Sequence, residues 1–308
     1  MTLRGALKLF FLRPRSFMES LMRIPFIARK ISDRSFISIV YRMRFKRSIN
    51  LDSPQTFNEK LLWLTLYNRR PEYVRMVDKY EAKNWIKEKL ENANKDVSCI
   101  IPTYGVFNHY DDINFDELPD SFVMKTTHDS GGVVVVDDKS QIDHAAAKDK
   151  LEKSLKRNYF WYTREWPYKD VPPRIIIEKK LITVEKSPID YKIYCFNGVA
   201  KYLYLVQDRD TQETVDYYDM NWEHLPIRQV YPNNTKRPNK PACWPEMVEY
   251  AEYLSEGIPF LRVDFYVDKD GYFFIGELTF TPSSGLLPLT PVEWDYTFGE
   301  QLDLPARE

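Results

Sequence analysis

The chain has 308 residues with a formal net charge of −1, and 44% of its residues are hydrophobic, 29% are charged and 10 are glycine. This composition is typical of a folded globular protein and excludes a largely disordered or collagen-like chain. Cys99, Cys195 and Cys243 are far apart and the four histidines are scattered, which argues against a disulfide framework and a Cys/His zinc site. This cysteine usage favours a reducing cytoplasm.

The charge is distributed very unevenly along the chain. Residues 1–50 contain twelve Lys or Arg residues against Glu19 and Asp33. Apolar residues such as Phe10 and Phe26 alternate with them, a pattern that predicts amphipathic helices with a cationic face. Two interpretations remain open. This basic arm binds the anionic surface on the inner face of the membrane, or it packs on the body of the protein with its charges in water. Since the rest of the chain is acidic, we expect no nucleic-acid partner.

No predicted element is long and apolar enough to span a membrane, and the start lacks the apolar region and cleavage site of a secretory signal.

Residues 51–99 are expected to form a helical lobe. The leucines of FNEKLLWLTL form an apolar face, which predicts a helix beginning near Phe57. Pro71 begins a second helical stretch over residues 72–91.

From Ile100 the sequence changes to short runs of β-branched and aromatic residues separated by turns. The strand-like runs are IIPTYGVF, SFVMKTT, GGVVVVDD, RIIIEKKLI, DYKIYCF, VAKYLYLVQD, TVDYYD, FLRVDFYVD and YFFIGELTF, with helices predicted over 143–158 and 245–256. We therefore expect an α+β fold, with one α+β subdomain over residues 100–180 and another over 181–308.

The first motif with chemical content is FVMKTTHDSGGVVVV, residues 122–136. A strand ending in Lys125 leads into a polar loop with Ser130, Gly131 and Gly132, and then into another strand, so the loop resembles a flap. Glycines allow backbone N–H groups to approach an anion, and Lys125 can contribute charge to phosphate oxygens. An ordinary hairpin would explain the same pattern. The loop is not a Walker A loop, because it lacks G-x-x-x-x-G-K-[ST].

The second motif is RIIIEKKLITVE, residues 174–185. An apolar strand ends in Glu178-Lys179-Lys180-Leu181, which predicts a linker whose backbone can read the edge of an adenine. Glu185 could accept hydrogen bonds from ribose hydroxyls. Taken alone, the pattern also fits an exposed, charged strand end.

The third motif is LRVDFYVDKDGYFFIGELTF, residues 261–280. If Lys269-Asp270-Gly271 forms a tight hairpin turn, Asp264 and Glu277 can be cross-strand neighbours. Two carboxylates in a largely apolar sheet repel each other, and a divalent cation relieves that repulsion. Oxygen ligands completed by nucleotide phosphates favour Mg²⁺ over zinc. Arg262, on the same strand face as Asp264, could stabilise a phosphoryl group in transfer. The alternative is a pair of exposed acids on an edge hairpin.

Together these motifs resemble the ATP-grasp superfamily. Within it, the chain resembles the TupA-like ATP-grasp family of bacterial capsule and teichuronopeptide loci, from about residue 57 to residue 304. The phrases that carry the resemblance, in order, are FNEKLLWL, VDKYEAK, KTTHDSGG, RIIIEKKL, DYKIYCFNG, LRVDFY and GELTFTPSSG. The resemblance implies an α+β ATP-grasp fold, in which two subdomains clamp ATP, preceded by a helical N-terminal region.

The resemblance also implies roles for the matching residues. Those expected at the ATP phosphates are Lys79, Lys125 and the flap residues Ser130, Gly131 and Gly132. Those expected at adenine and ribose are Glu178, Lys180, Leu181 and Glu185. Those expected at the γ-phosphate or an acyl phosphate are Lys192 and Arg262, and those expected at Mg²⁺ are Asp264, Glu277 and Thr279. The superfamily commonly has E-x-N where this chain has Glu277-Leu278-Thr279. This departure predicts that a second metal ion is bound more weakly or that Thr279 is a poor metal ligand.

The function implied is that of an ATP- and Mg²⁺-dependent carboxylate–amine ligase acting on a uronic acid of a cell-surface polysaccharide precursor. Two alternatives remain open at this point. A sugar kinase would use the same site with a general base, for which Asp190 is a candidate. A nucleotide-binding scaffold would recruit glycosyltransferases through the basic arm.

Overall fold

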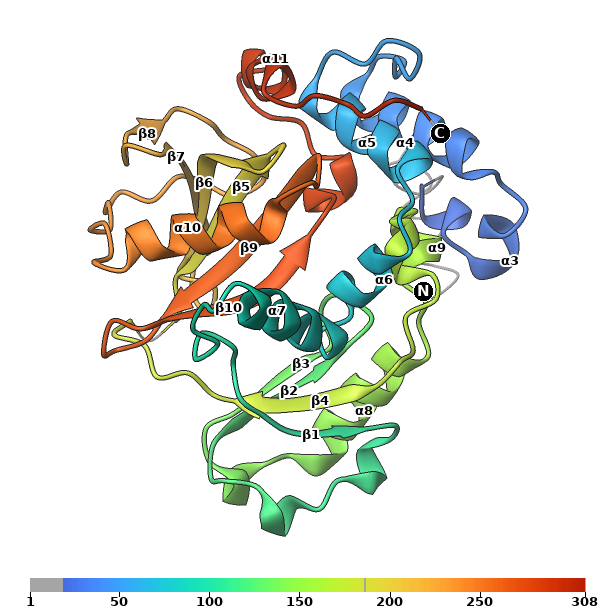
Figure 1. The fold of residues 1–308 in the computed structure, drawn as a ribbon. Coiled ribbons are helices and arrows are strands. Elements are labelled where there is room, and N and C mark those ends of the chain that lie inside the picture. Colours follow the sequence, from blue (N-terminus) through green and yellow to red (C-terminus); the bar gives the residue numbers. More distant parts are fainter. Residues whose placement is uncertain (1–18, 186, 308) are drawn as a thin grey trace.

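The computed structural model describes residues 19–185 and 187–307. The described strands form a four-stranded sheet and a six-stranded sheet, and helices from the N-terminal part of the chain lie beside both (Figure 1). No helix among the described residues is long and apolar enough to cross a membrane. Of the predicted basic arm, residues 1–18 lie outside the described part.

After a helical stretch over residues 19–22, the chain forms α3 (Pro25–Ala28) and α4 (Asp33–Phe45). On one face of α4, Phe36, Ile37, Val40 and Tyr41 are fully buried and pack with Met22, Leu62 and Leu286. The buried guanidinium of Arg164 donates to the carbonyl of Ala28 at 2.6 Å and pairs with Asp33 at 3.3 Å. The described part of the basic arm is therefore packed on the body of the protein.

Helix α5 (Phe57–Tyr67) begins at the predicted residue, because Thr56 and Glu59 form a reciprocal capping box. The predicted helical stretch 72–91 is instead two helices, α6 (Glu72–Val77) and α7 (Glu81–Asn92). Asp78 interrupts it, because its backbone turns to an extended conformation and its carboxylate accepts the N–H of Tyr80 at 2.9 Å. The break places Lys79 outside either helix.

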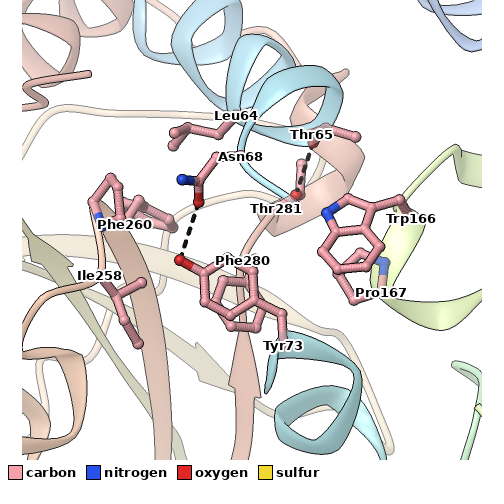
Figure 2. Close-up of a pocket in the computed structure, with 11 residues that line it drawn as sticks. Leu64, Thr65, Asn68, Tyr73, Trp166, Pro167, Ile258, Phe260, Phe280 and Thr281 are labelled. Carbon is pink, nitrogen blue, oxygen red and sulfur yellow. Dashed lines mark hydrogen bonds between the residues drawn. The ribbon is translucent and has the colours of Figure 1, made fainter. Parts of the chain in front are cut away.

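A small cavity lies where α5 and α6 meet residues 258–260 and 280–281 (Figure 2). The hydroxyl of Tyr73 donates to the side-chain carbonyl of Asn68 at 3.0 Å, and the hydroxyls of Thr65 and Thr281 are 3.2 Å apart. Its volume of about 20 Å³ holds at most a water molecule. It is therefore a packing feature and is too small for a nucleotide or a substrate.

The smaller sheet contains β1 (Thr103–Phe107), β2 (Phe122–Thr126), β3 (Val133–Val136) and β4 (Ile175–Lys179), in the antiparallel order β1-β4-β2-β3. Helix α8 (His144–Leu155) packs on one face, against residues such as Phe122, Met124, Ile175 and Ile177. Side chains alternate along a strand, so Lys125 and Glu178 lie on the opposite face. The connections include α9 (Phe160–Thr163) and the 3₁₀ turns Tyr110–Asp112, Phe115–Glu117, Lys139–Gln141 and Trp166–Tyr168.

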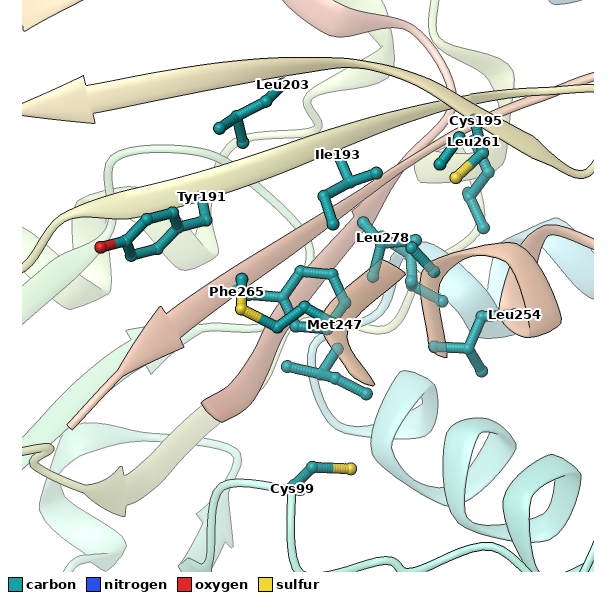
Figure 3. Packing of buried hydrophobic residues seen from close by; sticks show 14 of the residues in the cluster. Cys99, Tyr191, Ile193, Cys195, Leu203, Met247, Leu254, Leu261, Phe265 and Leu278 are labelled. Atoms are coloured by element: carbon teal, nitrogen blue, oxygen red, sulfur yellow. The ribbon is translucent and has the colours of Figure 1, made fainter. Parts of the chain in front are cut away.

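The larger antiparallel sheet has the order β10-β9-β5-β6-β7-β8. Its strands are β5 (Asp190–Phe196), β6 (Val199–Gln207), β7 (Thr214–Asp219), β8 (His224–Leu225), β9 (Phe260–Val267) and β10 (Phe273–Thr279). Helices α7 and α10 (Trp244–Ser255) cover one face (Figure 1). Figure 3 shows Ile193, Leu261, Phe265 and Met247 packed together in this core.

At one end, the opposite face of the larger sheet is covered by α5 and by α11 (Glu293–Glu300). These helices pack Phe57 and Phe298 against Tyr194 and Phe260. The remainder of that face carries charged side chains from β5 and β9. Because residues alternate, the same periodicity that buries Val263 and Phe265 on one side places Arg262 and Asp264 on the other. The charged face is where the candidate site lies.

Candidate active site

The β9–β10 hairpin brings two predicted carboxylates together. Asp264 and Glu277 are Cα partners in the antiparallel ladder, with a register shift at Gly276. The turn that joins the strands contains Gly271 at φ +86°, and the Asp268 carboxylate accepts the N–H groups of Asp270 and Tyr272 at 3.0 and 2.9 Å. The predicted cross-strand relationship is thus present.

One arginine contacts both carboxylates. Arg262 donates from Nε and Nη2 to the two oxygens of Asp264 at 2.6 and 2.7 Å. Its Nη2 also donates to Glu277 Oε1 at 3.2 Å and to the hydroxyl of Thr279 at 3.0 Å. Lys192, the β5 partner of Asp264, forms an ion pair with the same carboxylate. Two cations therefore compensate the two acids, which removes the repulsion that the sequence implies.

A third cation reaches this cluster from the break between α6 and α7. Burial by itself would raise the pKa of Glu277, but the charges of Lys79, Arg262 and Lys192 outweigh it and lower the pKa to about 2. Lys79 Nζ also donates to the carbonyl of Asp129, in the flap loop, at 2.5 Å. Glu277 is therefore ionised at neutral pH, and Lys79 connects the flap to the charged hairpin.

The face of the smaller sheet that carries Lys125 holds a second buried cluster. Glu178 forms ion pairs with Lys125 Nζ at 2.6 Å and with Lys83 Nζ at 2.8 Å, and only 3% of its side chain is exposed. Burial opposes ionisation, but these two lysines lower the pKa of Glu178 to about 2. The Glu178 side chain thus binds the flap lysine. Sequence reasoning missed Lys83, although it follows Lys79 by four residues in VDKYEAK.

The flap loop between β2 and β3 is anchored at its base by Asp129. The Asp129 carboxylate accepts the hydroxyls of Thr126 and Ser154, and Arg157 pairs with it at 2.7 Å. Ser130 and Gly131 are exposed at the tip, where Gly131 has φ +96°. Gly132 is buried, and a Cβ there would overlap the Thr126 and Ser154 hydroxyls. The two glycines therefore meet different requirements, backbone freedom at the tip and space at the base.

The predicted adenine and ribose residues lie on the segment that joins the two sheets. Lys180 pairs with Asp137, next to β3, and Leu181 is half-buried. The carbonyl of Ile182 accepts the N–H of Lys269 at 2.8 Å, so the segment runs beside the β9–β10 turn. Glu185 is exposed. The structure thus places Lys180, Leu181 and Glu185 on the segment that joins the two sheets, directly after Glu178 in β4.

A buried acid that the sequence interpretation did not include lies near the same cluster. Glu165 is 5% exposed and accepts the hydroxyl of Ser284 at 2.8 Å. Burial raises the pKa of Glu165 to about 7, and the charges of Arg262 and Glu277 act on it as well. A carboxylate inside the aromatic run FWYTREWPY was the available signal in the sequence.

Among the described residues, no group of three or more His, Cys, Asp or Glu side chains could hold a metal ion. Magnesium, however, usually takes only one or two carboxylates from a protein and completes its shell with phosphates and water. Asp264 and Glu277 supply two such carboxylates on adjacent strands, and the Thr279 hydroxyl donates to Glu277 at 3.1 Å. These residues therefore fit Mg²⁺ when a nucleotide provides the other ligands.

The chain is similar to one protein family and to several solved structures. The sequence profile of the family described as TupA-like ATPgrasp matches residues 59–303. No functionally curated protein matches the chain. Three similar solved structures are biotin carboxylase from Campylobacter jejuni, D-alanine–D-alanine ligase from Bacillus anthracis in complex with ATP, and N5-carboxyaminoimidazole synthetase from Staphylococcus aureus.

The similarity to these structures is distant. Sequence identities are 14%, 17% and 15%, and TM-scores are 0.42, 0.35 and 0.37, in the same order. The alignments cover 88%, 73% and 67% of this chain and 54%, 58% and 44% of the other chains, so this chain spans about half the length of those proteins. The family profile covers most of the present sequence, and the chain accordingly belongs to the TupA-like ATP-grasp family.

Proposed function

We propose that the protein is an ATP-dependent carboxylate–amine ligase that forms an amide through an acyl phosphate. The observation that carries the proposal is the pair of cross-strand carboxylates, Asp264 and Glu277, held by one guanidinium and facing lysines from other elements. Carboxylate oxygens suit Mg²⁺, and lysine and arginine side chains suit the negative charge of a nucleoside triphosphate. Membership of the TupA-like ATP-grasp family supports it.

ATP would lie between the two sheets. Lys79 and Lys125 would contact its phosphates, with Ser130, Gly131 and Gly132 closing over them, since the loop offers backbone N–H groups and Lys79 already bonds its carbonyl at Asp129. The joining segment, with Lys180, Leu181 and Glu185, would hold adenine and ribose. Glu178, in β4, would instead position Lys125 at the phosphates through the ion pair between them.

Asp264 and Glu277, with Thr279 beside them, would hold Mg²⁺, which neutralises charge on the phosphate oxygens when bound. Lys192 and Arg262, which neutralise Asp264 in this structure, would then turn toward the γ-phosphate. Arg262 has the planar fork that suits a phosphoryl group, and Lys192 adds a point charge.

The reaction would have two steps. A carboxylate oxygen of the acceptor attacks the γ-phosphorus, and the bond from that phosphorus to the oxygen of ADP breaks. The nitrogen of an amine then attacks the acyl carbon of the acyl phosphate, inorganic phosphate leaves, and the nitrogen loses a proton. Glu165 is suited to accept that proton, because its raised pKa of about 7 matches a general base at neutral pH.

For the acceptor we infer a uronic acid of a cell-surface polysaccharide precursor, on the basis of the capsule and teichuronopeptide context of the family that the sequence resembles. Such a precursor would be met in the cytoplasm, at the inner face of the membrane. The kinase alternative has no support from the site, because its candidate base, Asp190, is buried and paired with Arg209 and Lys192.

The test is a reaction of the purified chain with ATP, Mg²⁺, D-glucuronate or D-galacturonate, and a panel of amino acids and amines. We expect ADP and phosphate release that requires both acid and amine, and a product whose mass equals their sum minus water. A phosphorylated sugar formed without amine would favour the kinase instead. Absence of any release that depends on the acid would contradict the ligase proposal, provided that the chain binds ATP in the same buffer.

A further inference from the structure

A second, larger cavity lies beside the flap. Its volume is about 420 Å³, within the range of roughly 300–1,000 Å³ that is usual for small-molecule sites. The residues that give it its chemical character are Arg23, Arg44, Arg157, Tyr159, Tyr162 and Ser284. The cavity is thus built from the N-terminal helical segment, the region around α9 and the loop after β10.

Among the described residues, those that line the cavity and pair with its lining have an excess of positive charge. Arg157 is balanced by Asp129 at 2.7 Å, whereas Arg23 and Arg44 both pair with Glu19, at 2.5 Å each, and with no other acid in the described part of the chain. Arg44 also donates from Nη1 to the carbonyl of Leu286 at 3.1 Å, which orients it along the cavity wall. Both Arg23 and Arg44 keep 33% of their side chains exposed, so an entering anion can reach them.

The other walls connect the cavity to the candidate active site. Ser130, at the tip of the flap, is part of the lining, and so is Ser284, which donates to Glu165. Glu165 lies close enough to Arg262 and Glu277 for their charges to act on its pKa. Ser284 itself has a left-handed backbone, φ +57°, and its hydrogen bond to Glu165 orients its hydroxyl. A molecule in this cavity would therefore lie between the tip of the flap and the Ser284 hydroxyl that bonds Glu165.

We propose that this cavity is the acceptor site and that it selects a sugar acid through Arg23 and Arg44. The inference rests on the proposed ligase function and adds to it a binding site, a substrate charge and a role for the N-terminal helical segment. A guanidinium fork recognises a carboxylate through two parallel hydrogen bonds. Tyrosine and serine hydroxyls in the wall offer partners for the hydroxyls of a sugar ring. The acceptor would compete with Glu19 for the two arginines.

The experiment is a calorimetric titration of the full chain, loaded with Mg²⁺ and a non-hydrolysable ATP analogue. The probes are D-glucuronate and D-galacturonate, with D-glucose and D-galactose as neutral counterparts. We expect at least one uronate to bind about tenfold or more tightly than its neutral counterpart, and Arg23→Gln and Arg44→Gln each to weaken it about tenfold. Arg44→Lys should give an intermediate affinity, because it keeps the charge and loses the fork.

Arg42→Gln is the matched control. Arg42 is exposed on the same helix as Arg44, outside the cavity lining, so this variant should bind uronates as the unchanged chain does. Circular dichroism and thermal unfolding establish which variants are folded. If Arg44→Gln is not folded, the binding of uronate to Arg23→Gln decides the test. The proposal is overturned if neither uronate binds, or if folded Arg23→Gln and Arg44→Gln bind as tightly as Arg42→Gln.

Failure of the ligase proposal would look different. Uronate binding that depends on Arg23 and Arg44, without acid-dependent ADP formation, would support the binding cavity and contradict the ligase proposal. Conversely, acid-dependent ADP formation with the same KM for the acid in Arg44→Gln and Arg42→Gln would support the ligase proposal and show that this cavity is not its acceptor site.

Discussion

Asp264 on β9 faces Glu277 on β10 in the antiparallel ladder, and the guanidinium of Arg262 bonds both carboxylates. The two acids differ in burial, because 4% of the Asp264 side chain is exposed against 42% of that of Glu277. Replacing Asp264 therefore also leaves buried cations unpaired and destabilises the fold. A loss of activity in such a variant could not be distinguished from a loss of stability. Glu277 is the cleaner position at which to test the nucleotide site.

We predict that Glu277→Gln lowers ATP turnover by at least about 100-fold, because one proposed magnesium ligand loses its charge. It should remain folded with a somewhat lower melting temperature, because it loses the ion pair with Arg262, an effect that solvent weakens at a side chain that is 42% exposed. Steady-state ADP release and thermal unfolding measure the two effects. Asp270→Asn, in the exposed turn of the same hairpin, is the control and should keep its turnover. Near-normal rates in Glu277→Gln would mean that the magnesium site is elsewhere.

The Glu178 carboxylate, held by Lys83 and Lys125, should make the fold sensitive to acid. Its pKa of about 2 in the fold lies below its ordinary value of 4.5, so its stabilisation is present above about pH 4.5 and is lost as the pH falls toward 2. The shift corresponds to about 3 kcal/mol at neutral pH. We therefore predict that Glu178→Gln is less stable by about 2–4 kcal/mol at pH 7 and that this deficit shrinks on acidification.

Chemical denaturation of both proteins at several pH values between 3 and 7 measures that difference. Glu88→Gln is a suitable control, because Glu88 forms an exposed pair with Arg75, and such pairs contribute less than about 1 kcal/mol. A deficit of constant size across the pH range would show that the loss comes from packing and not from the charge of Glu178.

Glu165 should act in the opposite direction. Burial raises its pKa to about 7 in the fold, above its ordinary value of 4.5. The protonated acid is therefore favoured in the fold, and its contribution is complete below about pH 4.5 and is lost as the pH rises through 7. We predict that the stability of Glu165→Gln relative to the unchanged chain increases between pH 5 and pH 8. Denaturation midpoints measured at both pH values test this, and a relative stability that falls would contradict the prediction.

The two flap glycines should respond differently to alanine. In Gly132→Ala the new Cβ meets the hydroxyls of Thr126 and Ser154, so we expect the Asp129 anchor to be displaced and ATP binding to weaken strongly. In Gly131→Ala the space is open, and the cost is the backbone strain at φ +96°, about 1 kcal/mol. Titration with a fluorescent ATP analogue compares them. Equal affinities would show that the base of the flap does not position the nucleotide.

Helix α4 offers a test of the basic arm. Phe36 is fully buried, with the Arg164 guanidinium 4.6 Å above its ring, whereas Ile39 on the same helix is 43% exposed. We predict that Phe36→Ala lowers the free energy of unfolding by about 3–5 kcal/mol, and Ile39→Ala by less than about 1 kcal/mol. Similar effects of the two variants in chemical denaturation would argue against the packing of this helix on the body. Deleting residues 1–50 is a poor test of membrane recruitment, because it would expose this core.

Local patterns in the sequence were sufficient for much of the fold. The capping box at Thr56 and Glu59 marks the start of α5, and the alternation of apolar and charged residues in LRVDFYV separates the core face of β9 from the face with Arg262 and Asp264. The pairing of Asp264 with Glu277 could be predicted because a short turn joins their strands. The break at Asp78 was missed, because the apolar spacing of residues 72–91 continues across it.

The family and the pairing of Asp264 with Glu277 were therefore accessible from the sequence, since both depend on motifs of a few consecutive residues. Only the tertiary structure decided that Lys83 and Lys125 share Glu178, that Ser284 bonds Glu165, and that Arg44 reaches the loop after β10. These partners are between about 50 and 240 residues apart along the chain. Which of them meet depends on how helices and sheets pack, and a local pattern of residues does not carry that information.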